Sequence, residues 1–356
     1  MARVKFGDVV KEVKINIDRN TDNHEYFIAG DHMDSENIHI TRRGIFEGSD
    51  VGPAFIRLFK PGQILYGSRR TYLKKVAVAD FEGITSNTTF VLESKDENVM
   101  LQGLLPFYML TDSFTDYSIK KSKGSTNPYI LFSDLAQYEF ELPDIEKQRA
   151  LLDLLTACDR AKEAYKDLIR KTDDLVKSQF IEMFGAELRH EKLGDCTVIE
   201  KGKTITREQV IEGDIPVVAA GIEPSCYHNQ SNREAGVITV SASGANAGYV
   251  NYWNTPIFAS DCNTVITKDE SVLNNIFVYC RLKVAQQEIF QMQRGSGQPH
   301  VYAKDIAEID VPIPPIEKQK EYAAFVEQSD KSKFELQQSI ARMDSLIKSL
   351  IQQDNQ

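Results

Sequence analysis

Hydrophobic residues recur at alternating intervals of three and four along two long stretches of the chain, which is the spacing of one face of an α-helix. The first stretch follows Pro143 and ends before Gly185, since proline favours a helix start and glycine a helix stop. The second follows Pro314. Such a stripe is typical of a coiled-coil seam, so we expect the helices to pack on each other. The expected seam residues are Leu151, Leu154, Tyr165, Leu168 and Leu175 in the first helix and Tyr322, Phe325, Leu336, Met343 and Leu346 in the second.

The segments before and between these helices contain short β-strand patterns. Residues 76–79 and 88–92 are rich in β-formers, and turn signals at glycines such as Gly67 and Gly83 separate such runs. Residues 101–110 are the best helix candidate, with Pro106 near a start or at a kink. Globular segments and helices therefore alternate, with predicted boundaries at residues 1–142, 143–186, 187–313 and 314–356.

An internal repeat relates the two halves. Residues 123–180 recur without a gap at residues 294–351, so that Pro128 matches Pro299 and Gln148 matches Gln319 at a constant offset of 171. A loop, strand and helix that occur twice, each after a globular segment, predict two similar structural halves. A chain built in this way is suited to bind something that itself has two halves.

Length and composition agree with two soluble domains. The 356 residues are 42% hydrophobic and 26% charged, and no apolar run is long enough to span a bilayer. The first residues offer no continuous apolar stretch for secretion, so a cytoplasmic location is expected. Five cysteines without a Cys-x-x-Cys pair predict neither disulfides nor a zinc site, and we expect no bound metal.

The net charge of −10 argues against a nucleic-acid partner, but the charge is unevenly distributed. Residues 51–79 and 117–133 contain no Asp or Glu and include several Lys and Arg residues. A basic face for a polyanion is one interpretation, and a solvated face without a ligand is the other.

The two repeated motifs carry a resemblance to a known family. A Gly/Ser-rich loop begins at Gly124 and again at Gly295, and a Pro-x-x-Glu-x-Gln-like helix start follows Pro143 and Pro314. In this arrangement the chain resembles the specificity (S) subunit of type I restriction-modification enzymes over essentially its whole length. The first copy departs from the second in having Asp144 where the second has Pro315.

The resemblance implies an α+β protein with two mixed α/β target recognition domains, each followed by a long helix, and with the helices packed as an antiparallel coiled coil of pseudo-twofold symmetry. It implies a non-catalytic subunit without a cofactor of its own. The implied partners are double-stranded DNA with an interrupted target, two methyltransferase subunits with S-adenosylmethionine, and motor-nuclease subunits with ATP and Mg. Helices of this length, roughly 50 to 60 Å at 1.5 Å per residue, could space two short sites by about one to two turns of DNA.

Three groups of residues are candidates for DNA contact. Two guanidiniums in a turn can fork onto guanine or clamp phosphates, small residues in the repeated loops expose N–H groups to phosphates, and neutral groups in the second domain can read base edges. The candidates are Arg69, Arg70, Tyr72 and Lys74; Lys120, Lys121, Lys123, Ser125 and Asn127 with Arg294, Ser296, Gln298 and His300; and Ser241, Ser243, Asn246 and Tyr249.

Alternative functions are less well supported by the sequence. Asn127, Pro128 and Tyr129 are similar to an adenine-methyltransferase motif but lack its second proline, and residues 143–147 are similar to a nuclease motif but open a helix. No phosphate-binding P-loop pattern is present. A coiled-coil adaptor with two protein-binding modules, favoured by the acidic charge, and a stand-alone nuclease remain the rival hypotheses.

Overall fold

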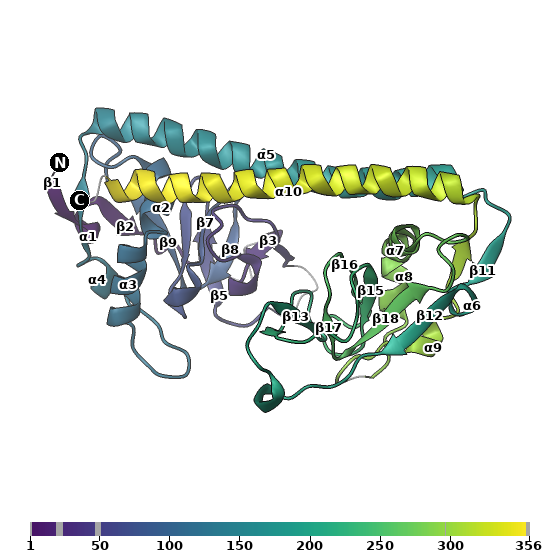
Figure 1. The fold of residues 1–356 in the computed structure, drawn as a ribbon. Helices are drawn as coiled ribbons and strands as arrows, with labels where there is room; N and C mark the ends of the chain where they lie inside the picture. Colours follow the sequence, from purple (N-terminus) through teal and green to yellow (C-terminus); the bar gives the residue numbers. More distant parts are fainter. Residues whose placement is uncertain (1, 19–23, 47–50, 296, 354–356) are drawn as a thin grey trace. The chain divides into compact units, whose positions relative to one another are not determined.

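The computed structural model describes residues 2–18, 24–46, 51–295 and 297–353 (Figure 1). The chain divides into two compact units, of which unit 1 contains residues 1–164 and 339–356 and unit 2 contains residues 165–338. Each unit therefore holds one globular domain and one part of each long helix. Among the described residues, no helix is both long and apolar enough to cross a membrane.

The globular domain of unit 1 is built from small sheets, mostly antiparallel. One has the strand order β2-β9-β6-β7, a second has the order β4-β3-β8-β5 with β3 and β8 parallel, and β1 pairs with β10. The strands are β1 (Ala2–Lys5), β2 (Val10–Glu12), β3 (Tyr26–Ile28), β4 (Gly44–Ile45), β5 (Phe55–Phe59), β6 (Ile64–Gly67), β7 (Val76–Val78), β8 (Gly83–Ser86), β9 (Thr89–Ser94) and β10 (Glu139–Leu142).

Short helices cover this domain. Residues 101–110 form a 3-10 turn that leads directly into α2, with Pro106 in the first turn of α2, as the sequence predicts. Thr111 caps α3, because its hydroxyl accepts a hydrogen bond from the Phe114 N–H. The helices are α1 (Phe6–Val9), η1 (Gly30–His32), η2 (Thr71–Leu73), η3 (Gln102–Leu104), α2 (Leu105–Met109), α3 (Asp112–Lys121) and α4 (Phe132–Leu135).

The globular domain of unit 2 repeats this plan. Its four-stranded sheet has the order β12-β18-β15-β16, β11 pairs with β19, and β13 lies parallel to β17 and antiparallel to β14. The elements are β11 (His190–Lys192), α6 (Leu193–Cys196), β12 (Thr197–Lys201), η4 (Arg207–Gln209), β13 (Ile215–Val218), β14 (Cys226–His228), β15 (Val237–Ser241), β16 (Val250–Trp253), β17 (Phe258–Ala259), β18 (Cys262–Thr267), α7 (Asn275–Val284), α8 (Gln286–Gln291), α9 (Ala303–Ile306) and β19 (Asp310–Pro312). The prediction of two mixed domains of similar fold is confirmed.

A buried glutamine fixes the start of each long helix. The Gln148 amide donates to the carbonyls of Val99 and Pro143, and its oxygen accepts from the Leu101 N–H. Gln319 makes the equivalent three hydrogen bonds in the second copy, and both side chains have no exposed surface. Since a buried amide is costly unless it is fully hydrogen-bonded, the repeated Ile-Glu-Lys-Gln motif ties each helix to the domain before it.

The long helices α5 (Ile145–Phe184) and α10 (Ile316–Gln353) pack on each other within each unit. In unit 2 the Tyr322 hydroxyl donates to the Val176 carbonyl at 2.7 Å, and Lys333 Nζ lies 2.7 Å from Asp173 Oδ1. Because the later residue of α5 meets the earlier residue of α10, the pair is antiparallel, as predicted. In unit 1, Lys162 Nζ lies 3.0 Å from Asp344 Oδ1.

The predicted seam is only partly correct. Leu151 and Tyr322 are buried, and Tyr165, Phe325, Leu336 and Met343 are half-buried. The packing role predicted for Leu154, Leu168, Leu175 and Leu346 is wrong within this chain, since each is about half exposed, at 54%, 48%, 53% and 48%. The more buried stripe of α5 passes instead through Leu155, which is buried, and through Ile169 and Val176, which are half-buried. This stripe has the same seven-residue spacing and lies one position further along the chain.

Candidate nucleic-acid interface

In unit 1 the structure places the Arg69-Arg70 turn directly against the loop that begins at Lys123. The Arg70 N–H donates to the Pro128 carbonyl at 2.7 Å, and the Ile130 N–H donates to the Ser68 carbonyl at 2.9 Å. The loop itself is closed by reciprocal backbone hydrogen bonds between Lys123 and Tyr129. The turn and the loop, two separate groups of candidate DNA contacts in the sequence, thus form one surface. We call it the turn-and-loop surface (residues 68–75 and 120–130).

Most of the candidates in this surface are accessible to solvent. The exposed side chains are Arg69, Arg70, Tyr72, Lys120, Lys121, Lys123, Ser125 and Asn127. The Arg69 guanidinium lies 6.0 Å from the centre of the Tyr129 ring, which is 39% exposed. Sequence reasoning missed Tyr129, although an aromatic residue in an acid-free loop is a signal for nucleic-acid contact.

Unit 2 contains the same backbone arrangement. The Gly244 N–H donates to the Pro299 carbonyl at 2.9 Å, the Val301 N–H donates to the Ala242 carbonyl at 3.0 Å, and Arg294 and His300 exchange backbone hydrogen bonds. These contacts align Arg69 with Ser243 and Arg70 with Gly244, at an offset of 174 instead of the 171 of the repeated loops. The equivalent surface of unit 2 comprises residues 242–249 and 291–301, and its Ser296 lies outside the described residues.

Two basic residues of unit 1 occupy backbone conformations that unit 2 assigns to glycine. Arg70 has a φ of 52° and Lys74 a φ of 47°, whereas the aligned Gly244 and Gly248 have φ of 76° and 87°. Left-handed conformations cost a residue with a Cβ roughly 1 to 2 kcal/mol, and such strain is concentrated at functional sites. Unit 1 therefore has Arg70 and Lys74 at positions whose backbone conformation favours glycine.

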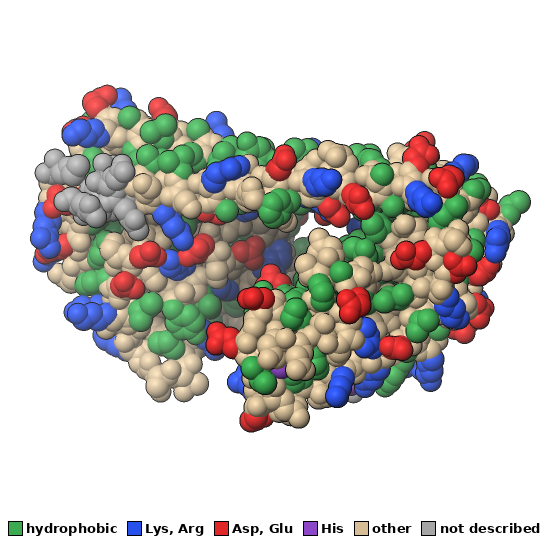
Figure 2. Space-filling view, viewed as in Figure 1, with side chains coloured by type: hydrophobic (Ala, Val, Ile, Leu, Met, Phe, Trp, Pro, Cys, Tyr) green, Lys and Arg blue, Asp and Glu red, His purple; other side chains and the backbone are tan. Residues whose placement is uncertain are grey.

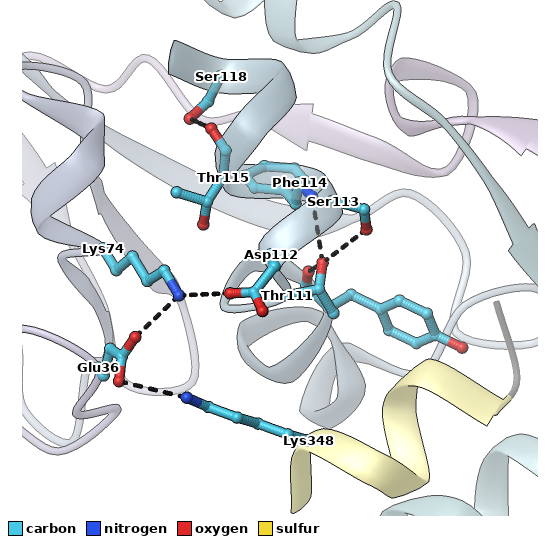
Figure 3. Close-up of polar contacts among 10 residues, drawn as sticks. Glu36, Lys74, Thr111, Asp112, Ser113, Phe114, Thr115, Ser118 and Lys348 are labelled. Carbon is cyan, nitrogen blue, oxygen red and sulfur yellow. Dashed lines mark hydrogen bonds and ion pairs between the residues drawn. The ribbon is translucent and has the colours of Figure 1, made fainter.

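Lys74 is not available for DNA, which corrects its assignment (Figure 3). Its amine lies 2.8 Å from both Glu36 Oε1 and Asp112 Oδ1, and its side chain is only 15% exposed. Burial opposes the charge, but the hydrogen bonds to Asp112 and Glu36 raise the pKa of Lys74 above its ordinary value. Glu36 also lies 3.9 Å from Lys348 of α10. Lys74 thus joins η2 to α3 and to the segment before β4.

An ion pair between each loop and the short helix that follows it is also repeated. Lys123 Nζ lies 2.9 Å from Asp134 Oδ2, and Arg294 lies at the same distance from Asp305 Oδ1. The carboxylates occupy equivalent positions at the start of α4 and α9. Both basic side chains are more than half exposed, so these pairs orient the cations without removing them from solvent.

Several candidates of unit 2 are not accessible as predicted. Ser241 and Ser243 are 4% and 5% exposed, and their hydroxyls donate to the Gly221 carbonyl and to the Asp261 carboxylate. The prediction that these serines read bases is wrong, because Ser241 is the last residue of the buried strand β15 and Ser243, two residues further on, is buried as well. Gln298 is exposed, Arg294 is exposed, and Asn246 and His300 are half-buried.

Tyr249 faces a different feature of unit 2. It lines a cavity of about 430 Å³ with residues of α7 and with parts of α5 and α10 that belong to this unit, and the Lys283 amine lies 4.7 Å from the centre of its ring. Lys177, Lys283 and Lys333 line the cavity with Asp173 and Asp330. Burial lowers the pKa of Lys283. Tyr249 is half-buried and lines this cavity, and its assignment as a direct DNA contact stays a prediction.

These features define a two-domain protein in which one backbone surface is built twice and carries different side chains each time. The model of the type I restriction modification DNA specificity domain matches residues 7–171 and again residues 188–342. The chain belongs to this family. The two matches agree with the internal repeat.

Individual relatives support the assignment. The chain is 26% identical over 325 residues to the MjaIX specificity subunit of a type I restriction enzyme from Methanocaldococcus jannaschii, across 79% of this chain and 74% of that protein. It is 23% identical over 220 residues to the HindI specificity subunit from Haemophilus influenzae, across 59% of this chain. That match spans 47% of the Haemophilus protein, about half its length.

Solved structures share the fold. The type I restriction-modification S subunit of M. genitalium has a TM-score of 0.61 at 17% identity, covering 100% of this chain and 96% of that one. A chain from a type I system studied for complex assembly and conformational transition has a TM-score of 0.55 at 18% identity, covering 100% and 97%.

Proposed function

We propose that the chain is the DNA specificity subunit of a type I restriction-modification complex, and that each domain reads one half of an interrupted duplex target. The carrying observation is the turn-and-loop surface, which has the same backbone contacts in both units but exposes different side chains. Two different half-sites can be read by the same backbone surface if the side chains on it differ between the two domains. The relatives named above, all specificity subunits, support the same function.

The chemistry of the two surfaces predicts different targets. In unit 1, Arg69 and Arg70 can donate in pairs to guanine O6 and N7 or to phosphate oxygens, and Tyr129 can stack beside them. In unit 2 the aligned positions hold a buried serine and a glycine. DNA contact is therefore assigned to Gln298, Asn246 and His300 at the edge of the same surface. We therefore propose that the first domain has the more cationic, guanine-favouring readout.

The partner subunits are assigned to the helices. Leu154, Leu168 and Leu175 follow one face of α5 at multiples of seven residues and are about half exposed, and Leu346 of α10 is the repeat equivalent of Leu175. Exposed apolar side chains in a row are typical of an interaction surface. Acidic and basic side chains are interspersed along α10 on the face seen in Figure 2. We propose that two methyltransferase subunits dock on the helical regions and that S-adenosylmethionine, ATP and Mg are bound by partner subunits, where methylation and cleavage take place.

A domain exchange tests the modular function. Residues 1–142 are replaced by the corresponding domain of a relative with a known target, and the chimera is expressed with the methyltransferase subunits. We expect methylome sequencing to show one altered half-site, while the other half and the gap between them stay the same. The unmodified chain serves as the control. A change in both halves, or in neither, would contradict the assignment of one half-site to each domain.

A further inference from the structure

A histidine and two carboxylates from distant parts of unit 1 converge beside the first half of α5. His39 lies in the segment between η1 and β4, while Asp159 and Glu163 are one helical turn apart on α5. The ligand atoms of all three lie within 4.8 Å of one another, and His39 Nε2 lies 2.7 Å from Asp159 Oδ2. None of these residues belongs to the turn-and-loop surface.

Both sides of this cluster are held in place by other contacts. The Ile38 carbonyl accepts a hydrogen bond from the Val78 N–H at 2.8 Å, and the His39 N–H donates to Asn37 Oδ1 at 3.0 Å. On α5, the fully buried Leu155 precedes Asp159 by one turn. Lys162 is fixed by its ion pair with Asp344 at 3.0 Å. The cluster is therefore pre-organised, which lowers the cost of assembling a ligand site.

The charges of the cluster favour a cation. Two carboxylates one turn apart on a helix repel each other, and the Asp159 side chain is only 10% exposed and paired with His39 Nε2, so a cation shared by the three groups would take the place of the hydrogen-bond proton and offset both charges. Imidazole nitrogen and carboxylate oxygen together form a ligand set for divalent first-row ions, and Zn²⁺ binds both at about 2.0 to 2.2 Å. Ligands at that distance lie about 3.4 Å apart around a tetrahedral centre, within the spread observed here.

We propose that His39, Asp159 and Glu163 bind a divalent transition ion, for which Zn²⁺ is the best match, and that this ion fastens the segment at residues 37–40 to α5. The His39 side chain is 41% exposed, which gives an ion a path from solvent and room for a water ligand. The site joins the first recognition domain to the helix that follows it, so its effect is on the rigidity of that junction and not on base contact.

Metal binding to the full chain tests this site directly. After dialysis against a chelator, the chain is titrated with Zn²⁺ by calorimetry and with Co²⁺ by absorption spectroscopy. We expect one ion per chain, a Co²⁺ spectrum without a thiolate charge-transfer band, and a higher Tm in the presence of Zn²⁺. His39→Gln, Asp159→Asn and Glu163→Gln should each weaken binding by at least about tenfold, since even loss of a supporting partner around a metal costs about 10- to 100-fold.

Two matched variants separate this site from other ligands of the chain. Cys158→Ser removes the thiol next to Asp159, and His190→Gln removes an exposed histidine of unit 2, and both should bind the ion as the unmodified chain does. Each variant is first shown to be folded by a cooperative melt without metal, and the three nearly isosteric changes provide independent tests. Absence of saturable binding, binding unchanged in all three ligand variants, or binding lost with Cys158→Ser would overturn the proposal.

Discussion

The turn after β6 and the turn after β15 have the same backbone hydrogen bonds but different side chains, basic in the first and glycine at the equivalent positions of the second. In unit 1 the left-handed positions hold Arg70 and Lys74, and in unit 2 they hold Gly244 and Gly248. Glycine is sufficient for the left-handed backbone conformation of the turn. The basic side chains of unit 1 therefore have a role other than forming the turn. For Lys74 that role is in an ion-pair cluster, whereas Arg70 is exposed and open to a ligand.

The comparison teaches how such a protein changes its target without changing its fold. The backbone contacts that join turn and loop involve peptide groups, so they tolerate any side chain that fits the surface. Exposed side chains at positions 69, 70 and 129 can then vary with little effect on the core. Under the proposed function, specificity would be carried by the exposed side chains, whereas the peptide groups of the same surface stabilise its backbone.

The largest expected effect comes from removing both arginines of unit 1. Arg69→Ala with Arg70→Ala should weaken binding of the target duplex by about 100-fold, since each paired contact to a base contributes about 1–3 kcal/mol. The slope of log K against log salt should also become shallower by up to about 2. Fluorescence anisotropy of the complex with its methyltransferase subunits, at several salt concentrations, measures both quantities.

Arg149→Ala with Arg160→Ala is the matched control, because it removes the same charge from exposed positions on α5. The control should retain most of the affinity. If the salt slope of the Arg69/Arg70 variant equals that of the unmodified chain, these arginines do not contact DNA, and the contrast between the two turns would have no functional meaning.

A smaller effect separates the backbone of Arg70 from its side chain. Arg70→Gly and Arg70→Ala both remove the guanidinium and should lose DNA affinity equally. They should differ in stability, with the glycine variant about 1 kcal/mol more stable, because only glycine adopts the left-handed conformation without strain. Chemical denaturation of both variants gives the comparison.

Gly244→Ala provides the mirror experiment in unit 2. A Cβ at this position would meet only Ala220 Cβ at 3.9 Å, an ordinary contact, so the expected loss of about 1 kcal/mol is conformational. Equal stability of Arg70→Gly and Arg70→Ala would show that the turn of unit 1 carries no strain.

Much of this organisation could be predicted from the sequence, because residues 123–180 and 294–351 match at a constant offset of 171. The antiparallel helices are confirmed. The alignment of Arg69 and Arg70 with Ser243 and Gly244 lies outside the repeat and follows from the backbone contacts of the two turns. The buried seam of α5 was misplaced by one residue, since Leu154 and Leu155 are adjacent leucines and only packing decides between them.

Other features depend on tertiary structure and left little trace in the sequence. Ser241 and Ser243 have the composition of a loop, but Ser241 is the last of the five buried residues of β15 and Ser243 lies two residues beyond it, so no alternation of exposed and buried positions marks the end of the strand. His39 and Asp159 are 120 residues apart, so spacing rules for metal ligands could not connect them. The partners of Lys74 come from two separate segments, which composition cannot reveal.

The smallest expected effect concerns Lys74 and sharpens its contrast with Arg70. Lys74→Met keeps the apolar stem but removes the amine, and it should lower the free energy of unfolding by about 1 kcal/mol or less, because Glu36 and Asp112 are partly exposed and solvent screens their charges. DNA affinity should change by less than about twofold, since the amine does not reach the duplex, and anisotropy measures this.

The pH dependence of the stability difference between Lys74→Met and the unmodified chain shows whether the ion pairs cause it. The hydrogen bond from Lys74 lowers the pKa of both carboxylates, so their contribution is present above their ordinary values of 3.8 and 4.5 and is lost as the pH falls through the lowered values. The pKa of Lys74 is raised, so its contribution is present below its ordinary value of 10.5 and is lost as the pH rises through the raised value. Denaturation midpoints of Lys74→Met and the unmodified chain should therefore differ most near neutral pH and converge at both extremes. A difference that stays constant with pH would assign Lys74 to packing alone, and a loss of DNA affinity as large as that of Arg70→Ala would return it to the DNA surface.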